Sequence, residues 1–124
     1  AYGDFSVNSG AVAAQELLDS HPDLTALICL NDRMAMGAIQ TAVARGLRIP
    51  ADLTVIGYDD IPVSAVYSPP LTTINQHAVL LGEEAARMLI DILNDKQPIP
   101  VVHQPTLIIR ETSAEPRLNV TAIE

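Results

Sequence analysis

Two short apolar runs flank a single helical segment, and this pattern restricts the fold more than any other feature of the chain. The runs are residues 25–30 (T-A-L-I-C-L) and 53–57 (L-T-V-I-G), each typical of a strand buried on both faces. Between them, Asn31 and Asp32 can cap a helix over about residues 33–45, with Gly46 just past its end. A strand, a helix and a strand in this order predict a right-handed parallel unit.

Further segments extend the same alternation. Residues 9–20 are expected to form a helix capped by Asn8 or Ser9, and residues 80–94 form the clearest amphipathic helix, with leucines and isoleucines along one side. Residues 71–75 and 107–110 are predicted strands. Hydrophobic residues make up 48% of the chain, but only three Tyr and one Phe are aromatic, so the core must be aliphatic. We therefore expect an α/β fold with a doubly wound, largely parallel sheet.

Charge, cysteine content and the lack of long apolar runs limit the partners and compartments that we expect for this chain. The net charge is −8, and the seven Lys and Arg residues are scattered, which argues against this chain itself binding nucleic acid. The single cysteine, Cys29, cannot form an internal disulfide and is expected to be inert core, which favours a reducing compartment. The chain starts at Ala1 without a leader, so we expect a processed product or part of a longer protein. No apolar run is long enough for a membrane helix.

Polar side chains follow both predicted strands. Asn31 and Asp32 come after the first strand, and Asp59 and Asp60 come after the second. The carboxyl ends of parallel strands lie at one edge of a sheet, where ligands bind, and amide and carboxylate groups there suit a sugar or a nucleobase. Asn31 and Asp59 are equally well explained as helix caps, and spacing alone leaves both interpretations open. Asp59 and Asp60 have no third hard ligand nearby, so we expect no metal site.

The sequence offers little for catalysis. It contains no nucleophile elbow, no zinc-protease motif, no dinucleotide fingerprint and no P-loop. The three histidines are isolated from one another in turn-like or extended segments. We therefore do not expect an enzyme, and we expect no cofactor. Tyr67 lies two residues before Pro69 and Pro70. It either packs within the protein or belongs to an exposed apolar patch that marks an interface.

Several motifs in a fixed order resemble the LacI/GalR family of bacterial transcription regulators. They are G-D-F-S-V-N-S-G (3–10), N-D-R-M-A-M-G-A (31–38), G-L-R-I-P-A-D-L-T-V-I-G-Y-D-D (46–60), P-P-L-T-T-I-N-Q (69–76), L-G-E-E-A (81–85) and L-I-I-R-E-T-S (107–113). The resemblance covers about residues 3–113. It implies one lobe of a periplasmic-binding-protein-like effector domain, with a small molecule in the cleft between two hinged lobes.

The resemblance also implies a division of the chain. Residues 1–75 would be the C-terminal lobe, with effector-binding and dimerisation surfaces. Residues 76–106 would be a crossover plus a helix belonging to the N-terminal lobe, residues 107–113 a returning strand, and residues 114–124 a tail. The DNA-binding helix-turn-helix and most of the N-terminal lobe would precede the chain.

The ligand contacts of the family fall on four positions of this sequence. Phe5 would stack on the effector ring, although core burial is the alternative for this residue. Asn31 and Asp59 would contact the effector at the two strand ends, and Gln76 would reach the cleft from the crossover. Asp60 is expected to cap a short helix beginning near Pro62. The resemblance implies a small-molecule effector, in the first place a carbohydrate.

The same resemblance implies a homodimer that reads operator DNA through the missing helix-turn-helix. Arg33, Met36 and Gln40 would project from one side of their helix into the dimer interface, with Met36 and Tyr67 exposed. The segment 64–70 would complete that interface with Ser64, Tyr67, Pro69 and Pro70. A cytoplasmic, non-membrane protein follows. The main alternative is a periplasmic sugar-binding protein of an uptake system, which shares the fold; an α/β enzyme is the second.

Overall fold

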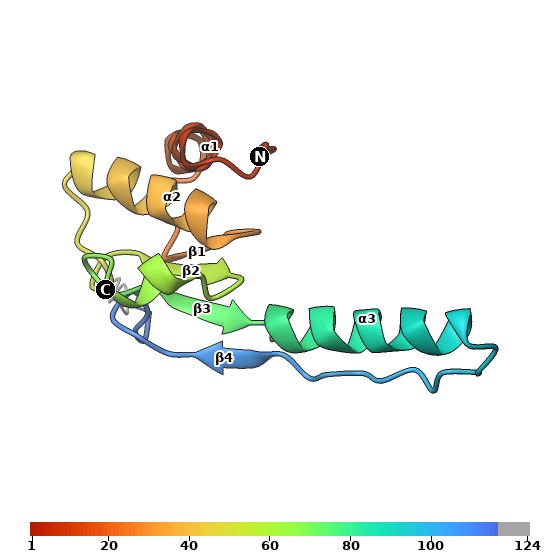
Figure 1. Ribbon diagram of the computed structural model, residues 1–124. Coiled ribbons are helices and arrows are strands. Elements are labelled where there is room, and N and C mark those ends of the chain that lie inside the picture. The colour runs from red at the N-terminus through yellow and green to blue at the C-terminus, as the bar shows by residue number, and fades with distance from the viewer. Residues whose placement is uncertain (117–124) are drawn as a thin grey trace, which may run out of the picture.

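The structure is a computed structural model that describes residues 1–116 (Figure 1). Three α-helices, four strands and one 3₁₀ turn lie in this part of the chain. In order they are α1 (Val7–Ser20), β1 (Ala26–Ile28), α2 (Asp32–Ala44), β2 (Thr54–Tyr58), η1 (Pro62–Ala65), β3 (Thr72–Asn75), α3 (Ala78–Leu93) and β4 (Thr106–Ile108).

The strands form one sheet in the order β1-β2-β3-β4. Strands β1, β2 and β3 are parallel, with Ala26 opposite Thr54 and Ile56 opposite Thr72. Strand β4 is antiparallel to β3. The sheet is therefore largely parallel and the fold is α/β, as the sequence predicts. Helices α1 and α2 lie on the same side of the sheet, with α2 nearer to the strands (Figure 1).

Close contact between α1 and α2 depends on small residues. A Cβ at Gly37 would lie 1.9 Å from the carbonyl oxygen of Val7, and a Cβ at Gly10 would lie 2.2 Å from the carbonyl oxygen of Met34. Only glycine permits the two backbones to approach so closely. The core beneath them is aliphatic, as expected; its buried members are Ala14, Leu18, Leu27, Ala35, Met36, Ala38, Ile39, Ala42, Leu53, Val55 and Leu71.

Helix α2 matches its prediction closely. Asn31 is the N-cap, and its side-chain oxygen accepts a hydrogen bond from the Met34 amide. Gly46 follows the helix with φ of +80°, a conformation that costs glycine little. Helix α1 begins two residues earlier than expected: Ser6, rather than Asn8 or Ser9, has an extended backbone and accepts from the Ser9 amide. The cap was misplaced because three candidate cap residues occur within four positions.

Strand β1 corrects a second expectation. Only Leu27 is buried, whereas Ile28 is 76% exposed and Leu30 72% exposed. A strand buried on both faces needs a layer on each side. Within the described residues β1 is an edge strand, and its helices lie on one side only, so the expectation of two buried faces is wrong here.

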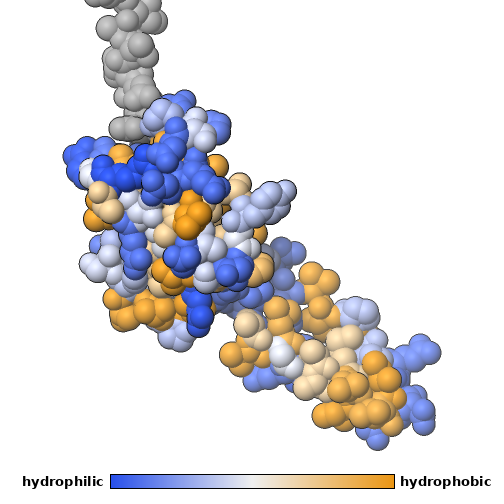
Figure 2. Space-filling view, turned by 90° about the horizontal axis from the view of Figure 1, so that it is seen from above, coloured by the Kyte–Doolittle hydropathy of each residue, from blue (hydrophilic) through white to orange (hydrophobic). Residues whose placement is uncertain are grey.

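Helix α3 projects beyond the end of the sheet, and residues 94–105 return beside it to β4 (Figure 1). The helix is amphipathic, as predicted, but none of its residues is buried. Its apolar side gives the projecting arm a largely hydrophobic surface (Figure 2). The exposed large apolar residues of the helix are Val79, Leu80, Leu81, Leu89, Ile90, Ile92 and Leu93. The assignment of residues 76–106 to another lobe stays a prediction.

The segment after β4 returns to the sheet and binds it. The Thr112 hydroxyl donates to the Val55 carbonyl at 2.7 Å and accepts from the Thr72 amide at 2.8 Å. The Val55 amide donates to the Thr112 carbonyl at 2.8 Å. Ala114, at the start of the predicted tail, hydrogen-bonds the Thr54 hydroxyl. Residues 117–124 of that tail lie outside the described residues. No helix in the described part of the chain is long and apolar enough to span a bilayer.

Candidate functional site

Two of the predicted site residues meet at the carboxyl ends of β2 and β3. Asp59 directly follows β2, and Gln76 directly follows β3. Because these strands are parallel neighbours, their ends lie at the same edge of the sheet. The Gln76 Nε2 donates a 2.7 Å hydrogen bond to Asp59 Oδ1, and the Asp59 amide donates to the Ile74 carbonyl at 2.9 Å. The sheet therefore brings these two side chains together.

A cleft of about 760 Å³ opens at this edge, between the strand ends and the first turns of α3. Its walls combine polar groups with apolar ones. They are Asp59, Asp60, Ile61, Pro62, Asn75, Gln76, His77, Ala78, Val79, Leu80 and Glu83. No Lys or Arg lines this cleft. Its ionisable groups are thus three carboxyls and one imidazole, which favours ligands that donate hydrogen bonds over anions.

Asp59 is held in an unusual environment. Its backbone φ is +109°, which non-glycine residues rarely adopt. Burial raises the pKa of Asp59 above its ordinary value of 3.8, and the negative charge of Asp32 raises it further. One of its carboxyl oxygens accepts from Gln76. A carboxylate oriented in this way can accept hydrogen bonds from ligand hydroxyl or N–H groups.

Asp60 does not cap the short helix, which corrects the prediction. The residue before η1 is Ile61, and it makes no side-chain cap hydrogen bond. Asp60 instead pairs with Arg110, whose Nη2 lies 2.6 Å from Asp60 Oδ1, and accepts from Asn75 Nδ2 at 2.9 Å. Arg110 follows β4, so its proximity to Asp60 is set by tertiary structure, fifty residues away in sequence.

Asp32, rather than Asp60, hydrogen-bonds to the short helix and to the residue before it. Asp32 is fully buried, and its Oδ2 accepts from the Ile61 amide at 2.9 Å and from the Ser64 hydroxyl at 2.6 Å. Its Oδ1 accepts from the Thr73 hydroxyl at 2.5 Å. Asp32 therefore ties the start of α2 to β3 and η1. From the sequence, Asp32 is expected only to help cap α2. Because Asn31 already caps this helix, the second polar residue beside it was the available sign of another role.

Asn31 and Phe5 are placed together but do not line this cleft. The Asn31 Oδ1 accepts from Met34 at 2.8 Å, and its Nδ2 donates to the Phe5 carbonyl at 3.0 Å. The cap interpretation of Asn31 is thus confirmed, and its contact with a ligand stays a prediction. Phe5 has φ of +66° and is 57% exposed, so it is not a core residue. Its role as a stacking platform likewise stays a prediction.

The predicted interface residues divide into exposed and buried groups. Arg33 and Gln40 are exposed. Met36 is only 6% exposed, however, and Ser64 is fully buried against Asp32, so the expected exposure of Met36 is wrong. Met36 lies on the side of α2 that packs into the core. Tyr67 is half-buried against the same core, and its hydroxyl donates to the Met36 carbonyl at 3.3 Å.

The two prolines of the predicted interface, Pro69 and Pro70, are half-buried. Gln40 Nε2 lies 3.4 Å from the Tyr67 hydroxyl and links α2 to the segment 64–70. The dimer interface itself stays a prediction.

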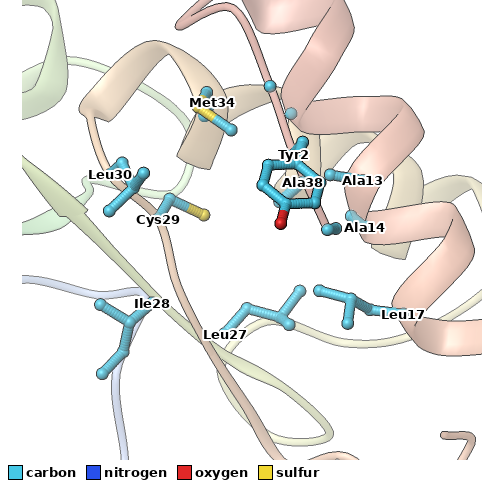
Figure 3. Close-up of a pocket in the computed structure, with 13 residues that line it drawn as sticks. Tyr2, Ala13, Ala14, Leu17, Leu27, Ile28, Cys29, Leu30, Met34 and Ala38 are labelled. Atoms are coloured by element: carbon cyan, nitrogen blue, oxygen red, sulfur yellow. The ribbon is translucent and has the colours of Figure 1, made fainter.

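A second cavity, of about 390 Å³, lies between α1 and β1 (Figure 3). The Tyr2 ring lies at one side, and the Cys29 thiol points into the space (Figure 3). Its walls are almost entirely apolar, with Leu17, Leu27 and Met34 among them. Burial raises the pKa of Cys29 to about 11, with a further contribution from the charge of Asp32, so this thiol is inert at neutral pH. Within residues 1–116 no group of three His, Cys, Asp or Glu side chains could hold a metal ion.

Comparison with known proteins identifies the class of this fold. Residues 2–113 match the model of the periplasmic binding protein-like domain, so the chain belongs to that family, in the branch formed by the LacI-family regulators. This confirms the resemblance that the sequence motifs indicated.

Two relatives and one solved structure illustrate the similarity. The HTH-type transcriptional regulator CelR of Thermobifida fusca is 40% identical over 114 residues, which are 90% of this chain and 34% of that protein. The HTH-type transcriptional repressor PurR of Aliivibrio salmonicida is 43% identical over 94 residues, 76% of this chain and 28% of the repressor. A solved CelR–cellobiose complex superposes with a TM-score of 0.86 at 39% identity, covering 91% of this chain and 35% of that one.

The lac repressor dimer bound to operator and the anti-inducer ONPF superposes with a TM-score of 0.78 at 36% identity, covering 90% of this chain and 39% of the repressor chain. The chain thus spans about a third of the length of the curated relatives it matches.

Proposed function

We propose that this chain is the effector-binding and dimerisation part of a LacI/GalR-type transcription regulator. A small molecule, in the first place a carbohydrate, binds at the Asp59–Gln76 cleft and alters the affinity of the dimer for operator DNA. The observation that supports this most directly is the cleft at the strand ends, where Gln76 Nε2 donates a 2.7 Å hydrogen bond to Asp59 Oδ1 and so orients the carboxylate. Structures with the same fold have been solved in complex with cellobiose and with lactose.

The hydrogen-bonding groups of the cleft favour a neutral, hydroxyl-rich ligand. The Gln76 amide nitrogen already donates to Asp59, and the Asn75 amide nitrogen donates to Asp60. The carboxylates of Asp59 and Glu83 and the Gln76 oxygen are acceptors, and they are matched by ligand hydroxyl or ring N–H groups. A phosphorylated sugar would bring negative charge to a wall that contains three carboxyls, which costs free energy.

The arm formed by α3 supports the proposed division of the chain. We assign residues 1–75 to the C-terminal lobe and residues 76–106 to a crossover and a helix that packs on the N-terminal lobe. Residues 107–113 return to the C-terminal lobe. The largely exposed apolar side of α3 fits a helix that is covered by another part of the protein.

The dimer and its operator complete the proposal. The lac repressor, to which this chain is 36% identical, is solved as a dimer on its operator. We place the dimer surface of this chain at Arg33, Gln40 and the segment 64–70, and the DNA-binding region before residue 1. The effector can change the affinity for operator DNA only to the extent that the effector itself binds the two lobe orientations with different affinities. We propose a cytoplasmic regulator without enzymatic activity, in line with its named relatives.

A periplasmic sugar-binding protein is the alternative, because it shares the fold. The coding region upstream of Ala1 separates the two functions. A helix-turn-helix followed by another α/β lobe is expected for the regulator, whereas a secretion signal leading directly into the lobe would contradict it.

Binding is tested by calorimetric titration of the protein with cellobiose, lactose and a purine base. We expect the wild-type protein to bind one of the neutral ligands, and we expect Asp59→Ala to bind it about tenfold to a hundredfold more weakly. A protein that binds none of them, or that turns one of them over, would contradict the proposed function.

A further inference from the structure

We propose that Arg110 is a positioning residue of the strand-end cleft, where it holds Asp59 and Gln76 in place by acting through Asp60 and Asn75. This inference rests on the proposed function. Arg110 does not line the cleft, and it lies two residues beyond β4. Its effect on a ligand is therefore indirect.

Arg110 is bound at three points. Its Nη2 donates to Asp60 Oδ1 at 2.6 Å, and its Nη1 donates to the Leu71 carbonyl at 2.8 Å. Its backbone amide donates to the Thr72 hydroxyl at 2.9 Å. The Arg110 and Asp60 side chains are only 18% and 16% exposed. The guanidinium thus joins the end of β2 to the start of β3 through charge-assisted bonds that water screens little.

Asp60 and Asn75 extend this connection to the cleft. The second carboxylate oxygen of Asp60 accepts from Asn75 Nδ2 at 2.9 Å. The Asn75 Oδ1 in turn accepts from the His77 amide at 2.7 Å. Gln76 stands between Asn75 and His77, so its backbone is fixed on both sides. Asp59 is fixed on one side by its neighbour Asp60, and its own amide donates to the Ile74 carbonyl at 2.9 Å.

The backbone at these positions needs such support. Asp59, Asp60 and His77 have φ values of +109°, +54° and +58°. Non-glycine residues occupy this region sparsely, and they remain there when surrounding contacts hold them. The Arg110–Asp60–Asn75 hydrogen bonds link the segments that contain all three residues. Removing the guanidinium is expected to release the turn that presents Asp59 and the segment that presents Gln76.

A purely structural role would be different. Arg110 could simply attach residues 109–114 to the sheet, as Thr112 does two positions further on. Thr112 binds Val55 and Thr72, at the other end of the strands from the cleft. Thr112→Val is therefore a matched control: it weakens the attachment of the same segment without touching Asp60.

The test compares Arg110→Met, Arg110→Lys and Thr112→Val in the 124-residue chain by nuclear magnetic resonance. We measure backbone amide exchange at Asp59 and His77, together with the side-chain amide signals of Gln76. In Arg110→Met we expect exchange at both positions to be faster by about tenfold or more, since a charge-assisted hydrogen bond is lost. The Gln76 side-chain signals should move to the position of a solvent-exposed amide. Arg110→Lys should shift them in the same direction by less, because an ammonium lacks the fixed fork that reaches two acceptors.

Thr112→Val should speed exchange at Val55 and Thr72 and leave the Gln76 signals unchanged. Unchanged Gln76 signals in a folded Arg110→Met would overturn the proposal, as would an equal shift in Thr112→Val. If Arg110→Met does not fold, Arg110→Lys decides in the same way. The wild-type chain is titrated separately with cellobiose, lactose and a purine base. If it binds none of these ligands, the result contradicts the proposed function but not the positioning role of Arg110.

Discussion

The Gln76 side-chain amide lies 2.7 Å from the Asp59 carboxylate, although the two residues follow different strands. This hydrogen bond orients one carboxylate oxygen toward the crossover that leads into α3. The other oxygen stays available for a ligand in the cleft. The pair thus connects the proposed effector contact to the segment between β3 and α3, where we propose that the chain crosses to another lobe.

Loss of the Asp59 carboxylate should weaken effector binding strongly and preserve the fold. For Asp59→Ala we expect effector affinity to fall by about tenfold to a hundredfold, as the loss of hydrogen bonds to a charged group predicts. Calorimetric titration measures the affinity and thermal unfolding measures the fold. Asp23→Ala, at an exposed turn position, is the control and should bind normally. Equal affinities in the two variants would contradict the assignment.

Both the stability of the fold and its effector affinity should depend on pH through Asp59. Its pKa is raised above 3.8 by burial and by the charge of Asp32. The folded state therefore keeps this proton at pH values where the unfolded chain has lost it. Above the folded pKa the ionised Asp59 lowers the stability of the fold. That stability is regained as the pH falls through the folded pKa toward 3.8.

An ionised carboxylate accepts hydrogen bonds from ligand hydroxyl groups more strongly than a protonated one does, so affinity should fall as the pH drops through the raised pKa. Titrations from about pH 4 to pH 7 measure this dependence. In Asp59→Asn the dependence should disappear, and a wild-type affinity that is constant over that range would contradict the prediction.

Asp32 should be essential to the fold. It is fully buried and accepts hydrogen bonds from Ile61, Ser64 and Thr73. Asp32→Ala leaves these buried donors without their acceptor, which is expected to cost about 3 kcal/mol or more of unfolding free energy. Urea denaturation measures this loss. Asp23→Ala serves again as the control, since its change should stay within about 0.5 kcal/mol.

Two glycines should respond oppositely to the same substitution. A Cβ at Gly37 would lie 1.9 Å from the Val7 carbonyl oxygen, so Gly37→Ala must separate α1 from α2. We expect a loss of about 2 kcal/mol or more, typical of overpacking at a close contact. A Cβ at Gly82, within α3, meets no atom within 4 Å. Gly82→Ala should therefore stabilise its helix by about 1 kcal/mol. Equal effects on the unfolding midpoint would disprove the packing argument.

The proposed dimer surface is tested at Val66, which is 79% exposed within the segment 64–70. Val66→Glu should weaken dimerisation, because it places a charge in an apolar patch that becomes desolvated. Analytical ultracentrifugation measures the association. Val12→Glu, at a 52% exposed position on α1, is the matched control. A variant at Val66 that stays as dimeric as the control would place the interface elsewhere. Met36 is unsuited to this test because it is buried within its own chain.

Much of the fold could be predicted because it depends on local patterns. Apolar runs predicted β1 and β2, the Asn31 cap and Gly46 predicted the bounds of α2, and the apolar spacing of residues 80–94 predicted α3. The edge position of β1 could not be predicted, because apolar composition does not tell how many layers cover a strand. The exposure of Met36 was misjudged for a related reason: the side of α2 that faces the core is set by packing against α1 and the sheet.

For the site, the sequence by itself determined which polar residues follow the strands, because the end of each apolar run marks the end of a buried strand. It thereby identified Asp59 and, through family resemblance, Gln76. Only the tertiary structure decided what each carboxylate does. Asp32 binds Ile61, Ser64 and Thr73, and Asp60 binds Arg110, and these partners lie 29 to 50 residues away in the chain. Hydrogen bonds and ion pairs of that kind depend on which strands become neighbours, and no local pattern of residues specifies them.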